Sequence, residues 1–194
     1  MNTPHSTAVV TGAGGTLCSA MAIELAHQGH PVALLGRNLS KLEPVAEIIR
    51  GQGGTALPLS VDVTDQGAVR AAGERVEREL GPCRILINGA GGKLEGTVMS
   101  QVEFTPEELK SDSKVLGFFN CDLEIFRREV DLNLLGTAIP SQVFGRQMAL
   151  AGGGSIINFA SMTSYRPLSK VAPYAAAKAA IINYTQWLSA YLAP

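Results

Sequence analysis

The stretch Thr7-Ala-Val-Val-Thr-Gly-Ala-Gly-Gly-Thr-Leu17 decides the fold of this chain. Its first five residues are apolar or β-branched and predict a short buried strand. Gly12, Gly14 and Gly15 then allow a tight turn, and a helix is expected over 17–28. Because the free N–H groups and the dipole at a helix N-terminus attract anions, this turn is a candidate pyrophosphate site.

Apolar segments alternate with helical segments along the rest of the chain. Further strands are expected over 31–36, 55–61, 84–88 and 155–159, and further helices over 39–50, 65–80, 123–150 and 172–192. The helix over 123–150 is expected to kink at Pro140, which cannot donate to the carbonyl of Gly136. Continuous apolar strands between helices indicate a parallel sheet covered on both faces. We therefore expect an α/β fold, a Rossmann-type doubly wound sheet in a single domain over 1–194.

The composition excludes several classes of protein. Of the 194 residues, 46% are hydrophobic and 17% are charged, and the net charge of -1 gives no reason to expect a nucleic acid or membrane partner. No stretch reaches the roughly 18 apolar residues of a membrane span, and the short polar N-terminus is expected to leave no room for a signal peptide. Cys18, Cys83 and Cys121 lack metal-ligand spacing and suit a reducing cytoplasm. We expect a cytoplasmic protein without a metal.

The strongest chemical signal is Tyr174-Ala-Ala-Ala-Lys178, which begins thirteen residues after Ser161. A Tyr and a Lys four residues apart lie on one face of a helix, where the ammonium favours the phenolate form of the Tyr. Such a Tyr can donate and accept protons in alcohol and carbonyl chemistry. This spacing is common by chance, so its value comes from other candidate residues that follow the predicted strands, where α/β folds bind ligands. These residues are Gly12, Gly36, Arg37, Asp62, Asn88 and Ser161.

Arg37 follows the second predicted strand, about where the adenosine ribose of a dinucleotide would lie. An acidic residue at this place binds the ribose hydroxyls, as in NAD sites, whereas an arginine meets a 2′-phosphate. The residue therefore favours NADP(H), with NAD(H) as the alternative cofactor. A solvated arginine without a ligand is the other interpretation.

With these residues assembled, the chain resembles the short-chain dehydrogenase/reductase family from about Thr7 to its last residue. The family holds the dinucleotide with a T-G-x-x-x-G-x-G turn. Thr11 and Gly12 match this turn, while Thr16 and Cys18 stand where the second and third glycines belong.

Two further segments carry the resemblance on the cofactor side. Asp62 matches the family acid that contacts the adenine amino group, and residues 88–91 match an N-N-A-G segment except at Gly89. The resemblance implies that the cofactor is bound by Gly12, Gly14, Gly15, Thr16, Leu17, Arg37, Asp62, Val63, Asn88, Ala90, Gly91, Tyr174 and Lys178.

The resemblance also implies four catalytic residues: Asn133, Ser161, Tyr174 and Lys178. Tyr174 would protonate the carbonyl oxygen in reduction or deprotonate the alcohol in oxidation, and Lys178 would hold the nicotinamide ribose. Ser161 would orient the reacting oxygen, and Asn133 would position a water that relays protons to solvent.

A narrower resemblance points to the D-mannonate oxidoreductase (fructuronate reductase) branch, which interconverts D-mannonate and D-fructuronate. It is carried by residues 11–20, 87–92, 131–137 and 161–168. Dehydrogenases of other polyols or keto acids, such as gluconate, are the nearest alternatives within the same reaction class.

Two features fit a sugar-acid substrate. The segment 92–122 is a long insertion between the fourth predicted strand and its helix, and long loops in compact domains are commonly functional. A substrate carboxylate needs a cation, for which Arg166, Lys170 and Lys93 are candidates. With Ser161, the residues Arg166 and Lys93 form the expected substrate contacts.

Family members usually continue beyond the helix over 172–192 with two more strands and a substrate-covering helix pair. We therefore expect an incomplete domain, with the strand over 155–159 as an exposed apolar edge. Two alternatives follow: a truncated dinucleotide-binding module without turnover, and a sugar epimerase or dehydratase that uses the same Y-x-x-x-K. The resemblance also implies a homodimer through the helices over 123–150 and 172–192.

Overall fold

The computed structural model describes residues 6–166 and 168–193. Contacts between residues divide the chain into two compact units. We name the first the sheet unit; it comprises the described residues up to Ala90 together with Gly136–Asn158. The second, the helical unit, comprises Gly91–Leu135 and the described residues from Phe159 onward.

The sheet unit is built on five parallel strands in the order β3-β2-β1-β4-β5. The strands are β1 (Thr7–Thr11), β2 (Val32–Gly36), β3 (Ala56–Ser60), β4 (Cys83–Asn88) and β5 (Ser155–Asn158). Thr11 pairs with both Leu35 and Asn88, so neighbouring strands end at one edge of the sheet. The order reverses between β1 and β4, and ligands of such folds bind beyond the strand ends at this point.

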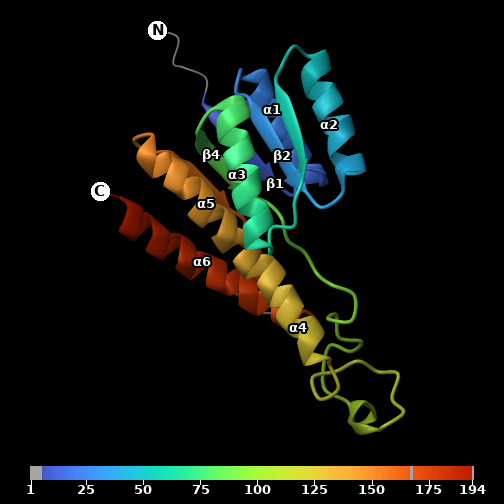
Figure 1. Ribbon diagram of the computed structural model, residues 1–194. Helices are drawn as coiled ribbons and strands as arrows, with labels where there is room; N and C mark the ends of the chain where they lie inside the picture. Colours follow the sequence, from blue (N-terminus) through green and yellow to red (C-terminus); the bar gives the residue numbers. More distant parts are fainter. Residues whose placement is uncertain (1–5, 167, 194) are drawn as a thin grey trace. The chain divides into compact units, whose positions relative to one another are not determined.

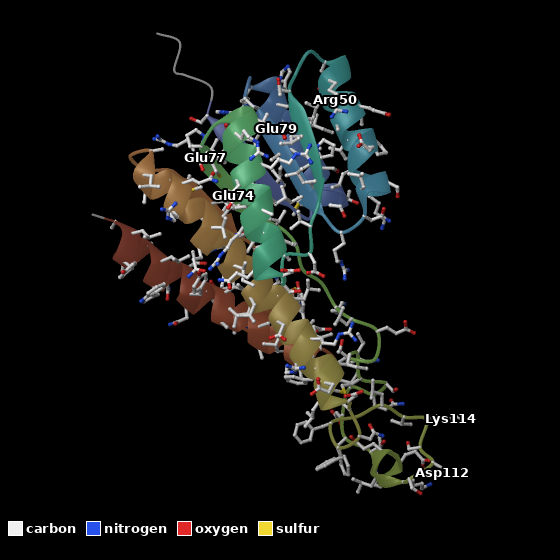
Figure 2. All side chains as sticks on the ribbon, in the orientation of Figure 1. Arg50, Glu74, Glu77, Glu79, Asp112 and Lys114 are labelled. Atoms are coloured by element: carbon white, nitrogen blue, oxygen red, sulfur yellow. The ribbon has the colours of Figure 1, made fainter. Side chains whose placement is uncertain are left out.

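Helices cover both faces of this sheet (Figure 1). Helix α1 (Thr16–His27) packs against α2 (Leu39–Gly51), and α3 (Gln66–Leu80) packs against α5 (Gly136–Leu150). The core on the α3 and α5 side is apolar and contains Val9, Leu35, Val69, Val76, Leu86 and Phe144. The opposite side of α3 is charged, and Figure 2 labels its exposed Glu74, Glu77 and Glu79.

The predicted strands and most predicted helices are confirmed within a residue or two. The start of α3 illustrates how a local sequence signal sets a helix boundary. Asp65 Oδ1 accepts a hydrogen bond from the Ala68 amide at 3.0 Å and caps the helix, as its position in the sequence predicts. The Rossmann-type parallel sheet is thereby confirmed. The assignment of 1–194 to one domain stays a prediction.

The predicted helix over 123–150 is helical along its whole range. It consists of α4 (Leu123–Val130), a π-helical turn η2 (Asp131–Leu135) and α5, which contains Pro140. The π-helical turn around Asn133 was not predicted, and the kink at Pro140 stays a prediction. The Asn133 side chain donates to the carbonyl of Glu129 at 2.9 Å, the group that a regular helix pairs with the backbone N–H of residue 133.

The helical unit contains α4, η2 and α6 (Ala172–Leu192), and both α4 and η2 pack against α6. A short 3₁₀ turn, η3 (Met162–Ser164), also packs against α6. The predicted insertion over 92–122 is confirmed as a long connection whose one regular element is the 3₁₀ turn η1 (Pro106–Leu109).

Membrane spans, metal clusters and disulfides are all lacking within residues 6–166 and 168–193. No helix there is long and apolar enough to cross a membrane. That same part of the chain holds no group of three or more His, Cys, Asp or Glu side chains arranged for a metal ion. All three cysteines are free, and burial raises the pKa of Cys83 to about 12.

Candidate active site

The glycine-rich turn of the sheet unit requires its glycines. Gly12 has a φ of 67°, and a side chain there would place a Cβ 2.8 Å from the backbone nitrogen of Ala90. A Cβ on Gly14 would lie 2.8 Å from the Cβ of Lys41. The turn is closed by the Gly15 amide, which donates to the Gly12 carbonyl at 2.9 Å. Gly12 and Gly14 are therefore required because the turn packs directly against Ala90 and Lys41.

The N-terminus of α1 fits an anion. Gly15 is its N-cap residue, and no side chain there hydrogen-bonds the first turn of the helix. Thr16 and Leu17 are both exposed, with 59% of the Leu17 surface accessible. The uncapped N–H groups and the helix dipole suit a pyrophosphate. These residues thus fit the predicted dinucleotide.

Two departures from the family pattern, Cys18 and Gly89, fit each other in space. Cys18 is buried in the first turns of α1, and Gly89 follows β4. A Cβ on Gly89 would lie 2.0 Å from the Cys18 Sγ, so the sulfur fills the space of a side chain at position 89. Thr11 Oγ1 accepts from the amides of Gly89 and Ala90, each at 3.1 Å, and fixes this segment beside β1.

Asp62 and Arg37 interact at the ends of β3 and β2. Asp62 Oδ1 accepts from the Thr64 amide at 2.9 Å and from its hydroxyl at 2.7 Å. Burial raises the pKa of Asp62, but the two Thr64 hydrogen bonds and the Arg37 charge outweigh it, so the net pKa is lowered. Arg37 is exposed, and Val63 is buried beside Asp62. An ionised acid and an arginine are thus both present where the adenosine half of a dinucleotide is expected.

Asn88 joins three elements of the sheet unit. Its Nδ2 donates at 2.9 Å both to Ser141 Oγ on α5 and to Asn158 Oδ1 at the end of β5. Its Oδ1 is buried without a hydrogen-bond partner among the described residues. Asn88 therefore fixes the end of β4 and leaves one acceptor unsatisfied.

The helical unit brings the predicted Tyr and Lys together. The Lys178 Nζ lies 5.8 Å from the centroid of the Tyr174 ring and donates to the carbonyl of Phe159 at 2.7 Å. Lys178 is 6% exposed, and this burial lowers its pKa. A Cβ on Gly91 would lie 3.6 Å from the same Nζ, so Gly91 permits the backbone to pass close to the ammonium.

Asn133 holds the segment beside Gly91. Its Nδ2 donates to the Gly92 carbonyl at 2.7 Å, and its Oδ1 accepts from the Gly92 amide at 3.0 Å. Asn133 is fully buried. Its side chain therefore acts as a brace, and the predicted role in positioning a water remains a prediction.

Ser161 forms the start of η3, which packs against the helix of Tyr174 and Lys178. Its Oγ accepts from the Thr163 amide at 3.2 Å, while Ser164 Oγ accepts from the Ser161 amide at 3.2 Å. This reciprocal capping fixes the backbone around Ser161. Its hydroxyl hydrogen can still be donated to a substrate oxygen.

The three candidate cations for a carboxylate differ in their surroundings. Lys170 Nζ donates to the carbonyl of Ser100 at 2.8 Å, so its ammonium is already used in the structure. Arg166 and Lys93 are exposed, and no hydrogen bond or ion pair to either side chain occurs within the part of the chain that the structure describes. Lys170 therefore differs from Arg166 and Lys93, the two predicted substrate contacts, because its ammonium already has a hydrogen-bond partner.

Sequence reasoning missed Glu129. This residue of α4 is fully buried, and its Oε2 accepts from the Leu94 amide at 2.5 Å and from the Thr97 hydroxyl. The only hint of Glu129 in the sequence is that it lies four residues before Asn133, which puts both side chains on one side of a helix. A partner in a loop more than thirty residues away cannot be inferred from that spacing.

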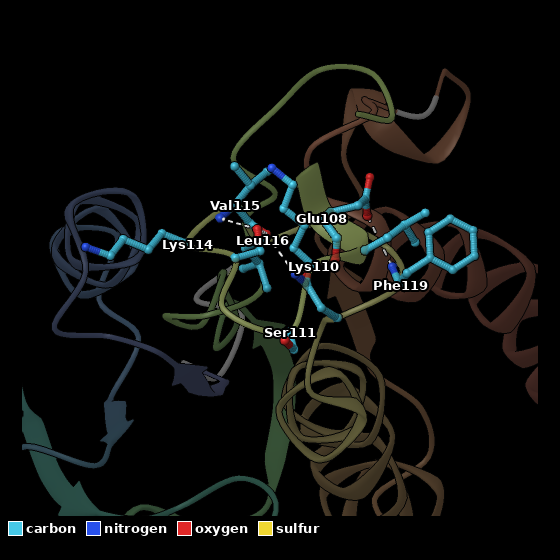
Figure 3. A pocket seen from close by; sticks show the side chains of 10 residues that line it. Glu108, Lys110, Ser111, Lys114, Val115, Leu116 and Phe119 are labelled. Atoms are coloured by element: carbon cyan, nitrogen blue, oxygen red, sulfur yellow. Dashed lines mark hydrogen bonds between the residues drawn. The ribbon is translucent and has the colours of Figure 1, made fainter. Parts of the chain in front are cut away.

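The insertion also contains a hollow of about 570 Å³, shown in Figure 3. Within it, the carboxylate of Glu108 accepts from the Phe119 amide at 3.2 Å. The lining residues all lie between Glu108 and Asn120, and none of them is a predicted catalytic or cofactor residue. The hollow is therefore separate from the Tyr and Lys pair.

The fold and these residues define a dinucleotide-binding α/β protein with a Tyr and Lys pair on one helix. The chain matches the short chain dehydrogenase family over residues 6–194. An uncharacterised oxidoreductase of Bacillus subtilis, UxuB, is 40% identical over 192 residues, covering 99% of this chain and 67% of that protein. The chain therefore belongs to the short-chain dehydrogenase family, a family of oxidoreductases.

Solved structures agree with this assignment. A structure from Haemophilus influenzae, described as a proposed D-mannonate oxidoreductase with bound NAD, has a TM-score of 0.90 and 35% identity, covering 97% of this chain and 66% of that one. An NAD+-bound xylitol dehydrogenase has a TM-score of 0.84 and 30% identity, covering 97% of this chain and 65% of that one. The chain thus spans about two thirds of the length of these relatives.

Proposed function

We propose that this protein is a dehydrogenase or reductase that transfers a hydride between a nicotinamide dinucleotide and an alcohol or carbonyl group. The observation that carries the proposal is the Lys178 ammonium, buried and held by the Phe159 carbonyl 5.8 Å from the Tyr174 ring centroid. The pair places a phenolic hydroxyl and an ammonium on one face of a helix, where they can act together as acid and base in alcohol and carbonyl chemistry.

Each residue of the helical unit has a role in this proposal. The bound nicotinamide supplies or accepts the hydride. Tyr174 delivers the proton to the substrate oxygen in reduction and removes it in oxidation. Ser161 donates a hydrogen bond to the same oxygen, and Asn133 keeps residues 91 and 92 beside Lys178.

For the substrate we propose the pair D-fructuronate and D-mannonate. The support is the resemblance of four segments to that branch, the similarity to a protein described as a proposed D-mannonate oxidoreductase, and two exposed cations without partners among the described residues. Gluconate or another polyol or keto acid is the alternative substrate. The epimerase or dehydratase alternative predicts no net change in the redox state of the cofactor.

For the cofactor we propose NADP(H), with NAD(H) as the competing choice. Arg37 supports NADP(H), because its guanidinium can pair with a 2′-phosphate. The two relatives with bound NAD support the competing choice.

Two further proposals concern the assembly and location of the protein. We propose a homodimer through the helices over 123–150 and α6, located in the cytoplasm. Support for the contact is a row of aromatic rings along α6, in which Trp187 stacks on Tyr184 at 6.1 Å and on Tyr191 at 5.1 Å. Trp187 and Tyr191 are more than half exposed. Light scattering would give twice the chain mass if this proposal is correct.

The second candidate function is a dinucleotide-binding module without turnover. It is kept because the uncapped N-terminus of α1 suits a pyrophosphate whether or not a substrate reacts. This candidate predicts binding of the cofactor without consumption.

The test is the absorbance at 340 nm of purified protein incubated with D-fructuronate and NADPH, and then with NADH. We expect absorbance to fall with one of them, and not with Tyr174→Phe. Binding of either cofactor without any fall would favour the module. A fall that is equal in the variant would remove Tyr174 from the mechanism.

A further inference from the structure

Residues 91–94 run beside the groups of the proposed reaction and are held at two points. Gly91 passes next to the Lys178 ammonium, and both backbone groups of Gly92 are bonded to the Asn133 side chain. The amide of Leu94 donates to Glu129 Oε2 at 2.5 Å. Lys93 is therefore flanked on both sides by residues that α4 and η2 hold in place.

The second anchor, Glu129, is an unusual choice for a buried position. It is fully buried and has no ion pair within residues 6–166 and 168–193. A buried carboxylate without a cation is destabilising unless hydrogen bonds compensate it. Oε2 accepts the hydrogen bonds of Leu94 and Thr97, and Oε1 is buried without a hydrogen-bond partner among the described residues. The cost of burying this carboxylate is best explained by the segment that Glu129 anchors, the first residues of the insertion.

Lys93 also differs from the other candidate cations because both of its chain neighbours, Gly92 and Leu94, are bonded to buried side chains. Lys170 is bonded to Ser100, and the backbone of Arg166 is held by one hydrogen bond, to the Met162 carbonyl at 3.2 Å. The Lys93 side chain is exposed, and its ammonium has no partner among the described residues. A charge between two anchored neighbours loses less freedom when it binds an anion.

We propose that Lys93 binds the carboxylate of the substrate and that Glu129 is the positioning residue that keeps Lys93 in place. This inference rests on the proposed function, because it assumes a sugar-acid substrate. Asn133 supplies the anchor on the other side of Lys93. Nothing in this proposal requires Glu129 to touch the substrate.

The first test replaces Lys93 with Gln in the full chain. Loss of a charge-assisted hydrogen bond should raise the KM for D-fructuronate roughly 10- to 100-fold while kcat changes little. Lys93→Arg should recover most of this loss. Arg166→Gln tests the competing cation, and Lys114→Gln is the matched control, an exposed lysine elsewhere in the insertion (Figure 2).

The second test concerns Glu129. Glu129→Leu removes the acceptor of Leu94 and Thr97 and should raise the KM in the same direction as Lys93→Gln. Glu129→Gln keeps one oxygen, which can accept both bonds as Oε2 does now, and should rescue the KM. In the Lys93→Gln background, Glu129→Leu should have little further effect on KM, which a purely structural role would not explain.

Calorimetric binding of D-mannonate and of its uncharged counterpart D-mannitol, with cofactor present, separates the two proposals. Lys93→Gln should weaken D-mannonate alone. Turnover by the wild type with unchanged binding in Lys93→Gln would overturn this inference and leave the proposed function intact. Failure of the wild type to reduce D-fructuronate or bind D-mannonate would overturn both the proposed substrate and this inference.

Discussion

The packing of Cys18 against Gly89 gives a sharp prediction for the sheet unit. Gly89→Ala would place its new Cβ 2.0 Å from the Cys18 Sγ and 3.0 Å from the Thr11 carbonyl oxygen. Neither neighbour can move freely, because Cys18 is buried and Thr11 belongs to the central strand. Overpacking of this kind costs roughly 1–3 kcal/mol, so we expect the free energy of unfolding to fall by about 2 kcal/mol.

Removing the sulfur should relieve most of that penalty. After Cys18→Ala the nearest atom of residue 18 is its Cβ at 3.6 Å, which is ordinary van der Waals contact. The single Cys18→Ala variant should lose about 1 kcal/mol through the small cavity it leaves. The double variant should therefore be more stable than the sum of the single changes predicts, by about 1–2 kcal/mol.

Urea unfolding of the wild type, both single variants and the double variant measures this coupling. A matched control is Gly51→Ala, since a Cβ there meets nothing within 4 Å. Strictly additive losses would show that the sulfur does not occupy the space at position 89. In that case Cys18 and Gly89 would not be complementary in their packing.

Three other predictions follow from charged groups. Burial lowers the pKa of Lys178, so the unfolded chain binds its proton more tightly. The stability of the wild type relative to Lys178→Met should therefore rise as the pH increases toward the unfolded pKa near 10.4. A flat difference in urea unfolding would refute this. The pKa of Asp62 is lowered, so this carboxylate contributes to the free energy of unfolding above its unfolded pKa of about 3.9, and the contribution is lost as the pH falls through the folded value. The stability of Asp62→Asn should therefore fall less than that of the wild type between about pH 6 and 3. An equal fall would show that Thr64 and Arg37 do not stabilise the carboxylate. Arg37→Ala should raise the KM for NADPH roughly tenfold or more with little change for NADH, and equal effects on both cofactors would show that Arg37 does not meet a 2′-phosphate.

The sequence predicts the sheet well because its strands are encoded locally. Runs such as Thr7–Thr11 and Val32–Gly36 consist mainly of apolar and β-branched residues and are buried over almost their whole length, as their patterns indicate. The π-helical turn around Asn133 could not be predicted in the same way. The Asn133 side chain bonds the backbone of Gly92, forty-one residues earlier, and helix propensity does not record such a contact.

The candidate site shows the same division. Tyr174 and Lys178 share a helix, so their spacing placed them on one face, and the structure has the ammonium near the ring. Glu129 contacts Leu94, and Gly89 contacts Cys18, and in both pairs the partner is distant in sequence. Contacts of this kind are set by tertiary packing, and spacing alone does not reveal them.

The most direct test of the central claim follows the hydride itself. Wild-type protein and Tyr174→Phe would each be incubated with D-fructuronate and a reduced nicotinamide cofactor carrying deuterium at C4 of the ring on the transferred face, and the product would be examined by mass spectrometry. We predict D-mannonate one mass unit heavier with the wild type and a yield at least a hundredfold lower with the variant. Product without deuterium, or equal labelled yields from the two proteins, would contradict hydride transfer assisted by Tyr174.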